Sequence, residues 1–103
     1  MAAKILVLYK QPPDPKAFDE YYFGTHAPLA RKLPRLRSTK FNAGPPLAFA
    51  GTAPHLIAEL EFDSLADLQA AMASPEGQAT AGDLHNFAQD PTVLIYETRP
   101  DQP

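Results

Sequence analysis

The sequence predicts an α+β fold of the ferredoxin-like type, with elements in the order β-α-β-β-α-β around one antiparallel sheet. Three observations lead to this prediction. Four short β-rich segments recur along the chain. One stretch with helical periodicity lies between the first and second segments and another between the third and fourth, and a chain of 103 residues is long enough for one hydrophobic core. Right-handed crossovers then place both helices on the same face of the sheet.

The predicted strands are short runs of apolar and β-branched residues, bounded by proline and glycine. The third run, HLIAELEF, alternates apolar and polar residues, as a strand with one buried face does. A long Pro/Gly-rich loop, residues 42–54, separates the second and third strands, and the sequence is compatible with either a lid or a dimer arm there. The four strands are expected at residues 4–9, 36–41, 55–62 and 92–98.

The first predicted helix follows a proline-rich turn and buries one apolar stripe. Pro28 cannot donate a backbone hydrogen bond to the Gly24 carbonyl, so we expect the helix to kink or restart there. Its buried stripe is expected to consist of Phe18, Tyr21, Tyr22, Leu29 and Leu33.

The second helical stretch begins after a serine. Ser64 is placed to cap the first turn, and Ser74 followed by Pro75 is typical of a fresh helix start. Gly82 is expected to end this second helix.

Composition limits the classes of function. The chain has no cysteine, so neither a disulfide framework nor a thiolate nucleophile is expected. The start of the sequence does not resemble a signal peptide and no apolar run is long enough to span a membrane, so we expect a soluble, cytoplasmic protein.

The charge distribution argues against a nucleic-acid partner. The net charge is −3, although Arg31, Lys32, Arg35, Arg37 and Lys40 form a basic cluster. An anionic ligand is one interpretation of this cluster, and the other is a solvated edge strand whose charges block aggregation. No nucleic-acid-binding motif accompanies it, so we expect no nucleic-acid partner.

The strands are apolar on both faces, which indicates a dimer. Ile5, Val7 and Tyr9 lie on one face of the first strand, and Leu6 and Leu8 lie on the other. Helices on one side of the sheet would leave the second set exposed. We therefore expect a homodimer in which two sheets pack face to face.

His26 is the strongest candidate for chemistry. An α-helical projection places it beside Tyr22, on the flank of the buried stripe. A half-buried imidazole next to a carbonyl freed by Pro28 can be held in one tautomer, which leaves its other nitrogen for a ligand or a proton transfer. The alternative is a purely structural histidine that satisfies the kink and packs against tyrosine.

Other polar residues suggest less. His55, at the start of the third strand, is expected to be exposed, and His85 to lie in a loop. The three histidines lack metal-ligand spacing, so a zinc site would need help from Glu59, Glu61 or Asp83, and we expect no metal. The sequence contains neither a nucleotide-binding glycine motif nor a nucleophile elbow.

Two segments resemble the EthD family. FDEYYFGTHAPLARKLPRLR, residues 18–37, resembles its N-terminal motif, in which an aromatic pair precedes a histidine, a proline and a leucine. GDLHNFAQDPTVLIYE, residues 82–97, resembles its C-terminal pattern, in which an aspartate and an asparagine-aromatic pair precede the last strand. The resemblance implies that residues 1–103 form one EthD-like domain.

This resemblance implies a dimeric α/β-barrel, the superfamily that includes muconolactone isomerases, polyketide cyclases, small monooxygenases and some haem-binding enzymes. EthD itself is associated with ether-degrading oxidation systems, and some relatives are called reductases. By the resemblance, His26 is the expected catalytic residue of a pocket that binds a small apolar or aromatic metabolite. The expected substrate-binding residues are Tyr9, Tyr22, Asn86 and Phe87.

The reaction stays open at this stage. A cofactor-free enzyme using His26 as acid or base, such as an oxidoreductase, isomerase or cyclase, is the first hypothesis. The second is a non-catalytic binding or accessory protein of an oxidative degradation pathway. Haem ligated by a histidine is a third, although we expect no cofactor.

Overall fold

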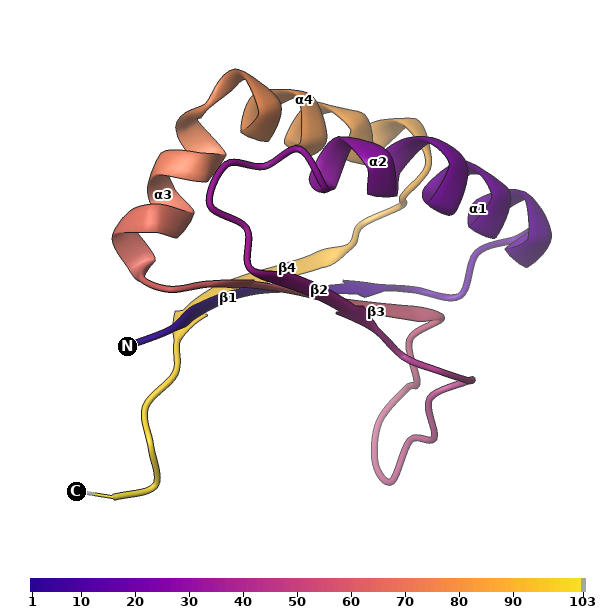
Figure 1. Ribbon diagram of the computed structural model, residues 1–103. Coiled ribbons are helices and arrows are strands. Elements are labelled where there is room, and N and C mark those ends of the chain that lie inside the picture. Colours follow the sequence, from indigo (N-terminus) through magenta and orange to yellow (C-terminus); the bar gives the residue numbers. More distant parts are fainter. Residues whose placement is uncertain (103) are drawn as a thin grey trace.

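In the computed structural model, which describes residues 1–102, four strands form one antiparallel sheet and all helices cover the same face of it (Figure 1). The strands are β1 (Ala3–Tyr9), β2 (Ser38–Phe41), β3 (Leu56–Phe62) and β4 (Thr92–Glu97). Their spatial order, β2-β3-β1-β4, is that of the split βαβ unit. The predicted ferredoxin-like α+β fold is confirmed.

Two helical stretches cross the sheet. The first consists of α1 (Pro15–Tyr21), a π-helical turn (Tyr22–His26) and α2 (Ala27–Ala30). The second consists of α3 (Leu65–Ala73), α4 (Pro75–Asp83) and a 3₁₀ turn (Leu84–Asn86).

Serine and aspartate caps fix where the helices begin. The Asp14 carboxylate accepts a hydrogen bond from the Ala17 amide, and Ser64 and Ser74 cap α3 and α4 in the same way. The expectation that Gly82 ends the helix is wrong. Gly82 lies inside α4 without a positive φ, and the chain tightens into the 3₁₀ turn only after Asp83.

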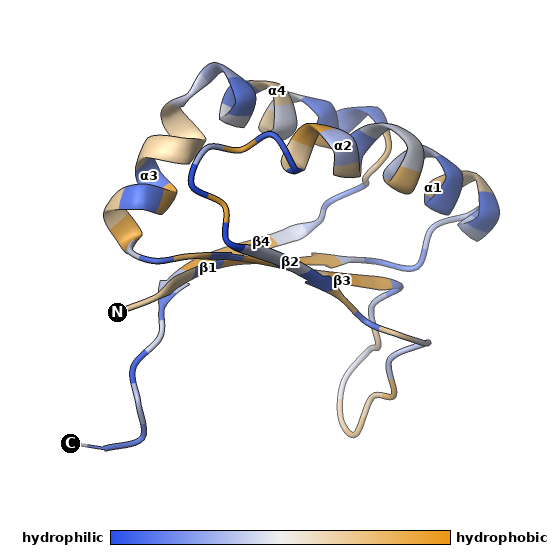
Figure 2. Cartoon of the chain, in the orientation of Figure 1, coloured by the Kyte–Doolittle hydropathy of each residue, from blue (hydrophilic) through white to orange (hydrophobic). Residues whose placement is uncertain are grey.

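The core lies between the sheet and the helices. On β1 the side chains of Ile5, Val7 and Tyr9 are buried, and on β3 those of Leu56, Ala58 and Leu60 are buried beside them. This alternation matches the period of two that the sequence predicted. In Figure 2 hydrophobic residues, in orange, recur along the sheet beneath the helices.

The kink expected at Pro28 takes the form of a π-helical turn. The Ala27 amide donates to the Tyr22 carbonyl five residues earlier, and Pro28 then occupies the first turn of α2, where no amide donor is required. The wider turn rotates the residues that follow it relative to an uninterrupted α-helix. His26, the last residue of this turn, is only 4% exposed, whereas the sequence predicts it to be half-buried on the flank.

The second face of the sheet carries no helix (Figure 1). Strand register places Leu6 opposite Leu94 and Leu8 opposite Ile57 on this face. Lys4 also lies there and forms an ion pair with Glu59 at 3.4 Å. Leu94 is 46% exposed, so an apolar surface lies open on the side away from the helices.

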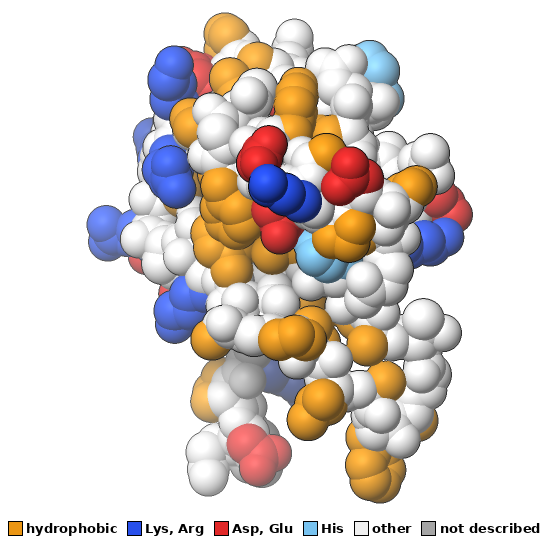
Figure 3. Space-filling model, turned by 90° about the vertical axis from the view of Figure 1, so that its right-hand side faces the viewer, with side chains coloured by type: hydrophobic (Ala, Val, Ile, Leu, Met, Phe, Trp, Pro, Cys, Tyr) orange, Lys and Arg blue, Asp and Glu red, His pale blue; other side chains and the backbone are white. Residues whose placement is uncertain are grey.

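The loop between β2 and β3 projects from this bare side of the sheet, away from the helices (Figure 1). It is anchored by Asn42, whose side chain bonds to the Ile57 amide and to the carbonyls of Gly44 and His55. Leu47 and Phe49 are fully exposed on it. Hydrophobic side chains are visible at the end of this projection in Figure 3. Its direction makes it unsuitable as a lid over the helix-covered face of its own chain.

In the basic cluster, Lys40 lies on β2, an edge strand, and Arg31 lies at the end of α2; the other members are exposed on the segment between these two elements. Arg35 pairs with Asp67 at 2.8 Å and Arg37 pairs with Asp63 at 3.0 Å. These pairs fit the interpretation of a solvated edge.

Candidate functional site

A cavity of about 130 Å³ lies between the sheet and the two helical stretches. Its floor is the buried face of β1 and β3, its roof comes from the π-helical turn, α2 and α4, and its mouth lies where Ala81 and Val93 are exposed. Aliphatic side chains form most of the wall. The polar side chains lining it are Tyr9, Tyr22, His26 and Thr80.

His26 is held at the cavity wall by a carboxylate. Its Nδ1 lies 3.0 Å from Oδ2 of Asp83, which is the last residue of α4 and only 8% exposed. The same carboxylate accepts hydrogen bonds at Oδ1 from the Tyr21 hydroxyl, at 2.7 Å, and from Nδ2 of Asn86, at 2.9 Å. Asp83 therefore joins the first helical stretch to the second.

The electrostatics of Asp83 fix the tautomer of His26. Burial acts to raise the pKa of Asp83, but hydrogen bonds from Tyr21, Asn86 and His26 together lower it below its usual value. An ionised carboxylate can only accept, so Nδ1 of His26 carries the proton in this contact. In the neutral imidazole Nε2 then has the free lone pair, and within residues 1–102 the Asp83 contact is the only hydrogen bond that His26 makes.

Two buried phenols complete the polar part of the cavity. Burial raises the pKa of Tyr22 to about 12, with opposing contributions from Tyr9 and Arg31. Burial also raises the pKa of Tyr9, and the neighbouring Tyr22 and Asp83 raise it further. Both phenols are neutral at physiological pH, and a side-chain hydrogen bond between Tyr9 and Tyr22 leaves one of the two hydroxyl protons free to donate.

The sequence of residues 10–91 matches the model of the family described as the EthD domain. The chain belongs to the EthD family. It is 37% identical over 95 residues to an uncharacterized 11.0 kDa protein of the thcB-thcC intergenic region in Rhodococcus erythropolis, and the match covers 90% of each chain. A solved EthD family protein from Bacillus halodurans is 40% identical, with a TM-score of 0.86 and coverage of 96% of this chain and 100% of the other.

More distant structures share the fold of this EthD chain. A hydroxynitrile lyase from Passiflora edulis has a TM-score of 0.76 at 17% identity, covering 99% of this chain and 97% of the other. A protein from Thermobifida fusca, described as dimeric and ferredoxin-like, has a TM-score of 0.70 at 15% identity, covering 95% and 92%. At these identities the likeness concerns the fold alone.

The structure of this EthD domain separates the expected site residues into two groups. Tyr9 and Tyr22 line the same cavity as His26. Phe87 contacts the His26 ring, with ring centroids 4.7 Å apart. It does not line the cavity of His26 but a second cavity beside it. Asn86 is exposed and donates to Asp83, so it acts on the cavity through that carboxylate.

Sequence reasoning missed the role of Asp83. From the sequence, Asp83 is indicated only as a potential zinc ligand. Within the part of the chain that the structure describes, no group of three metal-ligating side chains occurs. A signal was present in the EthD C-terminal pattern, where an aspartate stands three residues before an asparagine. That spacing places the two side chains on one side of a helical turn.

The two other histidines lie away from this cavity of the EthD domain. The expectation that His55 is exposed is wrong. The His55 side chain is partly buried because its ring packs edge-on against Phe18, and its Nε2 lies 2.8 Å from Oδ1 of Asp19. His85 lies in the 3₁₀ turn and is exposed.

Among residues 1–102 no helix combines the length and the apolar character needed to cross a membrane.

Proposed function

We propose that this EthD domain binds a small, largely apolar or aromatic metabolite in the cavity beside His26, and that His26 acts there as a general acid or base. The observation that carries the proposal is the buried His26–Asp83 pair at the wall of a largely aliphatic cavity. A cavity of about 150 Å³ with apolar walls holds a molecule the size of benzene, so a ligand with one ring fits the volume.

The roles of the residues follow from their hydrogen-bonding capacity. Asp83 holds the Nδ1 proton, so Nε2 takes a proton from the bound ligand and later returns it. As the imidazole becomes charged, the ionised Asp83 stabilises it. One hydroxyl of the neutral Tyr9–Tyr22 pair donates to a ligand oxygen on which negative charge develops. Proton transfer of this kind suits an isomerase, a cyclase or a cofactor-free oxidoreductase.

Substitution of His26 tests the acid–base role. Small aromatic compounds are first screened for stabilisation of the wild type, where a hundredfold excess over Kd adds about 2.7 kcal/mol, and the same samples are then analysed for products. We expect a bound compound that the wild type converts and that His26→Ala binds without converting. A variant that remains folded and turns the compound over at an unchanged rate would remove His26 from the mechanism.

A non-catalytic carrier or accessory protein is the second candidate. The observation that favours it is the scarcity of ionisable groups, since His26 and the two phenols are the titratable side chains on a largely aliphatic wall. In that case ligands stabilise the wild type and His26→Ala alike, and no bound compound is converted.

We also infer that the functional unit is a homodimer paired through the bare face of the sheet. Apolar side chains on β1, β3 and β4 lie open there, and the protruding loop presents Leu47 and Phe49 on the same side. Burying them against a second copy removes apolar surface that a monomer would leave in water. The dimeric description of the Thermobifida fusca neighbour supports the inference.

A further inference from the structure

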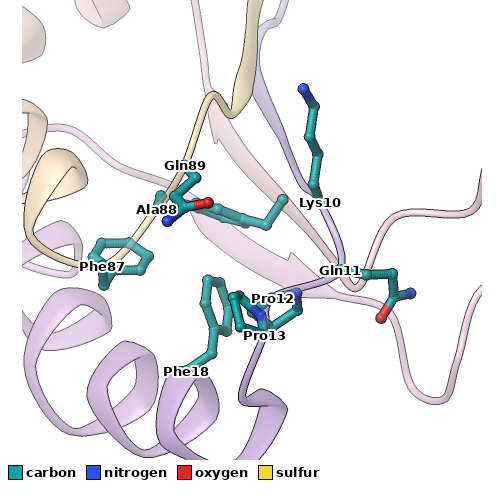
Figure 4. Close-up of a pocket in the computed structure, with 9 residues that line it drawn as sticks. Lys10, Gln11, Pro12, Pro13, Phe18, Phe87, Ala88 and Gln89 are labelled. Carbon is teal, nitrogen blue, oxygen red and sulfur yellow. The ribbon is translucent and has the colours of Figure 1, made fainter.

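A second cavity, of about 160 Å³, lies next to the His26 cavity. Figure 4 shows Phe18 rising from α1 towards Phe87, with Pro12 and Pro13 of the β1–α1 loop beside them. Tyr9 supplies a further wall. The rim carries two side-chain amides, from Gln11 and Gln89.

Phe87 stands between the two cavities. Its ring centroid lies 4.7 Å from that of His26 in the first cavity and 5.5 Å from that of Phe18 in the second. Tyr9 lines both cavities, and its ring lies 5.6 Å from that of Phe87. The ring of Tyr22, in the first cavity, also lies 6.1 Å from that of Phe18 and 5.7 Å from that of Phe87, so three rings form the partition, and Phe87 is the one that a loop supplies.

The segment that carries Phe87 is held by backbone hydrogen bonds on one side and contacts Lys10 through an exposed ion pair on the other. The Phe87 amide donates to the Leu84 carbonyl at 3.3 Å, which closes the 3₁₀ turn, and the Ala88 amide donates to the same carbonyl at 2.8 Å. Three residues beyond Phe87, Asp90 bonds to Lys10 at 2.7 Å. The partition thus has a defined position.

From this geometry we propose that the two cavities are subsites of one elongated binding space, and that Phe87 determines the length of ligand that the space admits. The inference rests on the proposed function, since the first subsite is the cavity beside His26. With Phe87 in place a ligand with one ring occupies the first subsite. Without its ring, the space extends from His26 to the amides of Gln11 and Gln89.

The chemistry of the second cavity favours a neutral ligand. Its walls are three aromatic rings, which pack well against another ring. Lys10 lies at its edge, but the carboxylate of Asp90 neutralises it. The Gln11 and Gln89 amides both donate and accept hydrogen bonds, so they suit a hydroxyl or carbonyl group.

Two neutral probes that differ by one ring, phenol and 2-naphthol, test the inference. Each is titrated into ¹⁵N-labelled wild type, Phe87→Ala, Phe87→Leu and the control Phe23→Ala, which removes a ring that is 43% exposed and lines neither cavity. We expect phenol to be preferred by the wild type and by Phe23→Ala. Phe87→Ala should bind 2-naphthol about tenfold more tightly than the wild type does, because a second ring is buried.

Chemical shifts distinguish the two proposals. In Phe87→Ala, 2-naphthol should move the signals of His26 and also the side-chain amide signals of Gln11 and Gln89. Phe87→Leu, which keeps a bulky side chain, should show a smaller gain in affinity for 2-naphthol. If Phe87→Ala unfolds, the 2-naphthol affinity of Phe87→Leu is compared with that of the wild type instead. An unchanged 2-naphthol affinity in the folded Phe87 variants overturns the inference. If phenol leaves the His26 signals of the wild type unmoved, the proposed function fails. Whether the cavities connect is then still decided by 2-naphthol, which in Phe87→Ala should shift the signals of His26, Gln11 and Gln89 together.

Discussion

At the scale of single residues, the site depends on the contact between His26 and Asp83. The carboxylate receives three hydrogen bonds, from Tyr21, Asn86 and His26, and each donor comes from a different part of the helical layer. Charge-assisted bonds of this kind are stronger than neutral ones. The carboxylate thus selects one imidazole tautomer and also holds two helical stretches together.

The first prediction concerns the tautomer of His26. In the wild type, at a pH where the imidazole is neutral, ¹⁵N NMR should show the proton on Nδ1. Asp83→Ala removes the acceptor, so the proton should redistribute towards Nε2, the nitrogen favoured in free imidazole side chains. Asn86→Ala leaves the His26–Asp83 contact intact and is the control. An Nδ1–H signal that persists in Asp83→Ala would contradict the role assigned to the carboxylate.

The second prediction concerns acid stability. The pKa of Asp83 is lower in the folded state than in the unfolded chain, so ionised Asp83 stabilises the fold above its unfolded value of about 3.9. This contribution is lost as the pH falls through the lower folded pKa. Urea unfolding measured from pH 7 to pH 2 should therefore show a steeper loss of stability below pH 4 in the wild type than in Asp83→Asn. If the free energy of unfolding fell equally steeply with pH in the wild type and in Asp83→Asn, ionised Asp83 would not contribute to the stability.

At the scale of elements, the π-helical turn and the contact between α3 and α4 position the two sides of the cavity. The π-helical turn directs His26 inwards, and α4 presents Asp83 to it. The connection from α3 to α4 is tight at Gly77. A Cβ at this position would meet the backbone carbonyl oxygens of Ala71 and Met72, the latter at 2.5 Å.

A matched pair of glycine substitutions in α4 tests this contact. Gly77→Ala forces α3 and α4 apart and should destabilise the fold by about 1–3 kcal/mol. Gly82→Ala lies in the same helix with open space around the added methyl group, so it should stabilise the fold by roughly 0.5–1 kcal/mol. Urea unfolding measures both, and equal effects of the two substitutions would refute the assigned contact.

At the scale of the whole molecule, a sheet with helices on one face exposes the other. Leu6 and Leu94 face each other across β1 and β4 on that surface, and Tyr96 is 41% exposed near them. Edge strand β4 is exposed along its whole length. An edge of this kind is prone to uncontrolled association unless another chain covers it.

The last prediction is therefore about assembly. Sedimentation at micromolar concentration should give a species of twice the 11.2 kDa chain mass. Leu94→Lys places a charge in the middle of the proposed interface and should shift the species to the monomer mass, because an unpaired buried charge is costly. Ala79→Lys, on the exposed surface of α4, should leave the dimer intact. A wild type that sediments as a monomer would exclude pairing through the sheet.

The sequence by itself determined the order of the elements, the buried faces of β1 and β3, and the presence of a distortion before Pro28. These features are local: alternation, helical periodicity, serine caps and the missing amide of proline act within a few residues. The sequence also indicates His26 as a candidate site residue, from the aromatic residues around it and the EthD-like motif.

Only the tertiary structure decided what His26 contacts and which cavity each aromatic residue lines. Asp83 lies 57 positions away along the chain, and its meeting with His26 depends on how α4 packs beside the π-helical turn. The position of Phe87 between two cavities likewise depends on a loop that crosses from α4 to the edge strand β4. Such long-range contacts leave no period in the sequence, because they are set by the packing of whole elements.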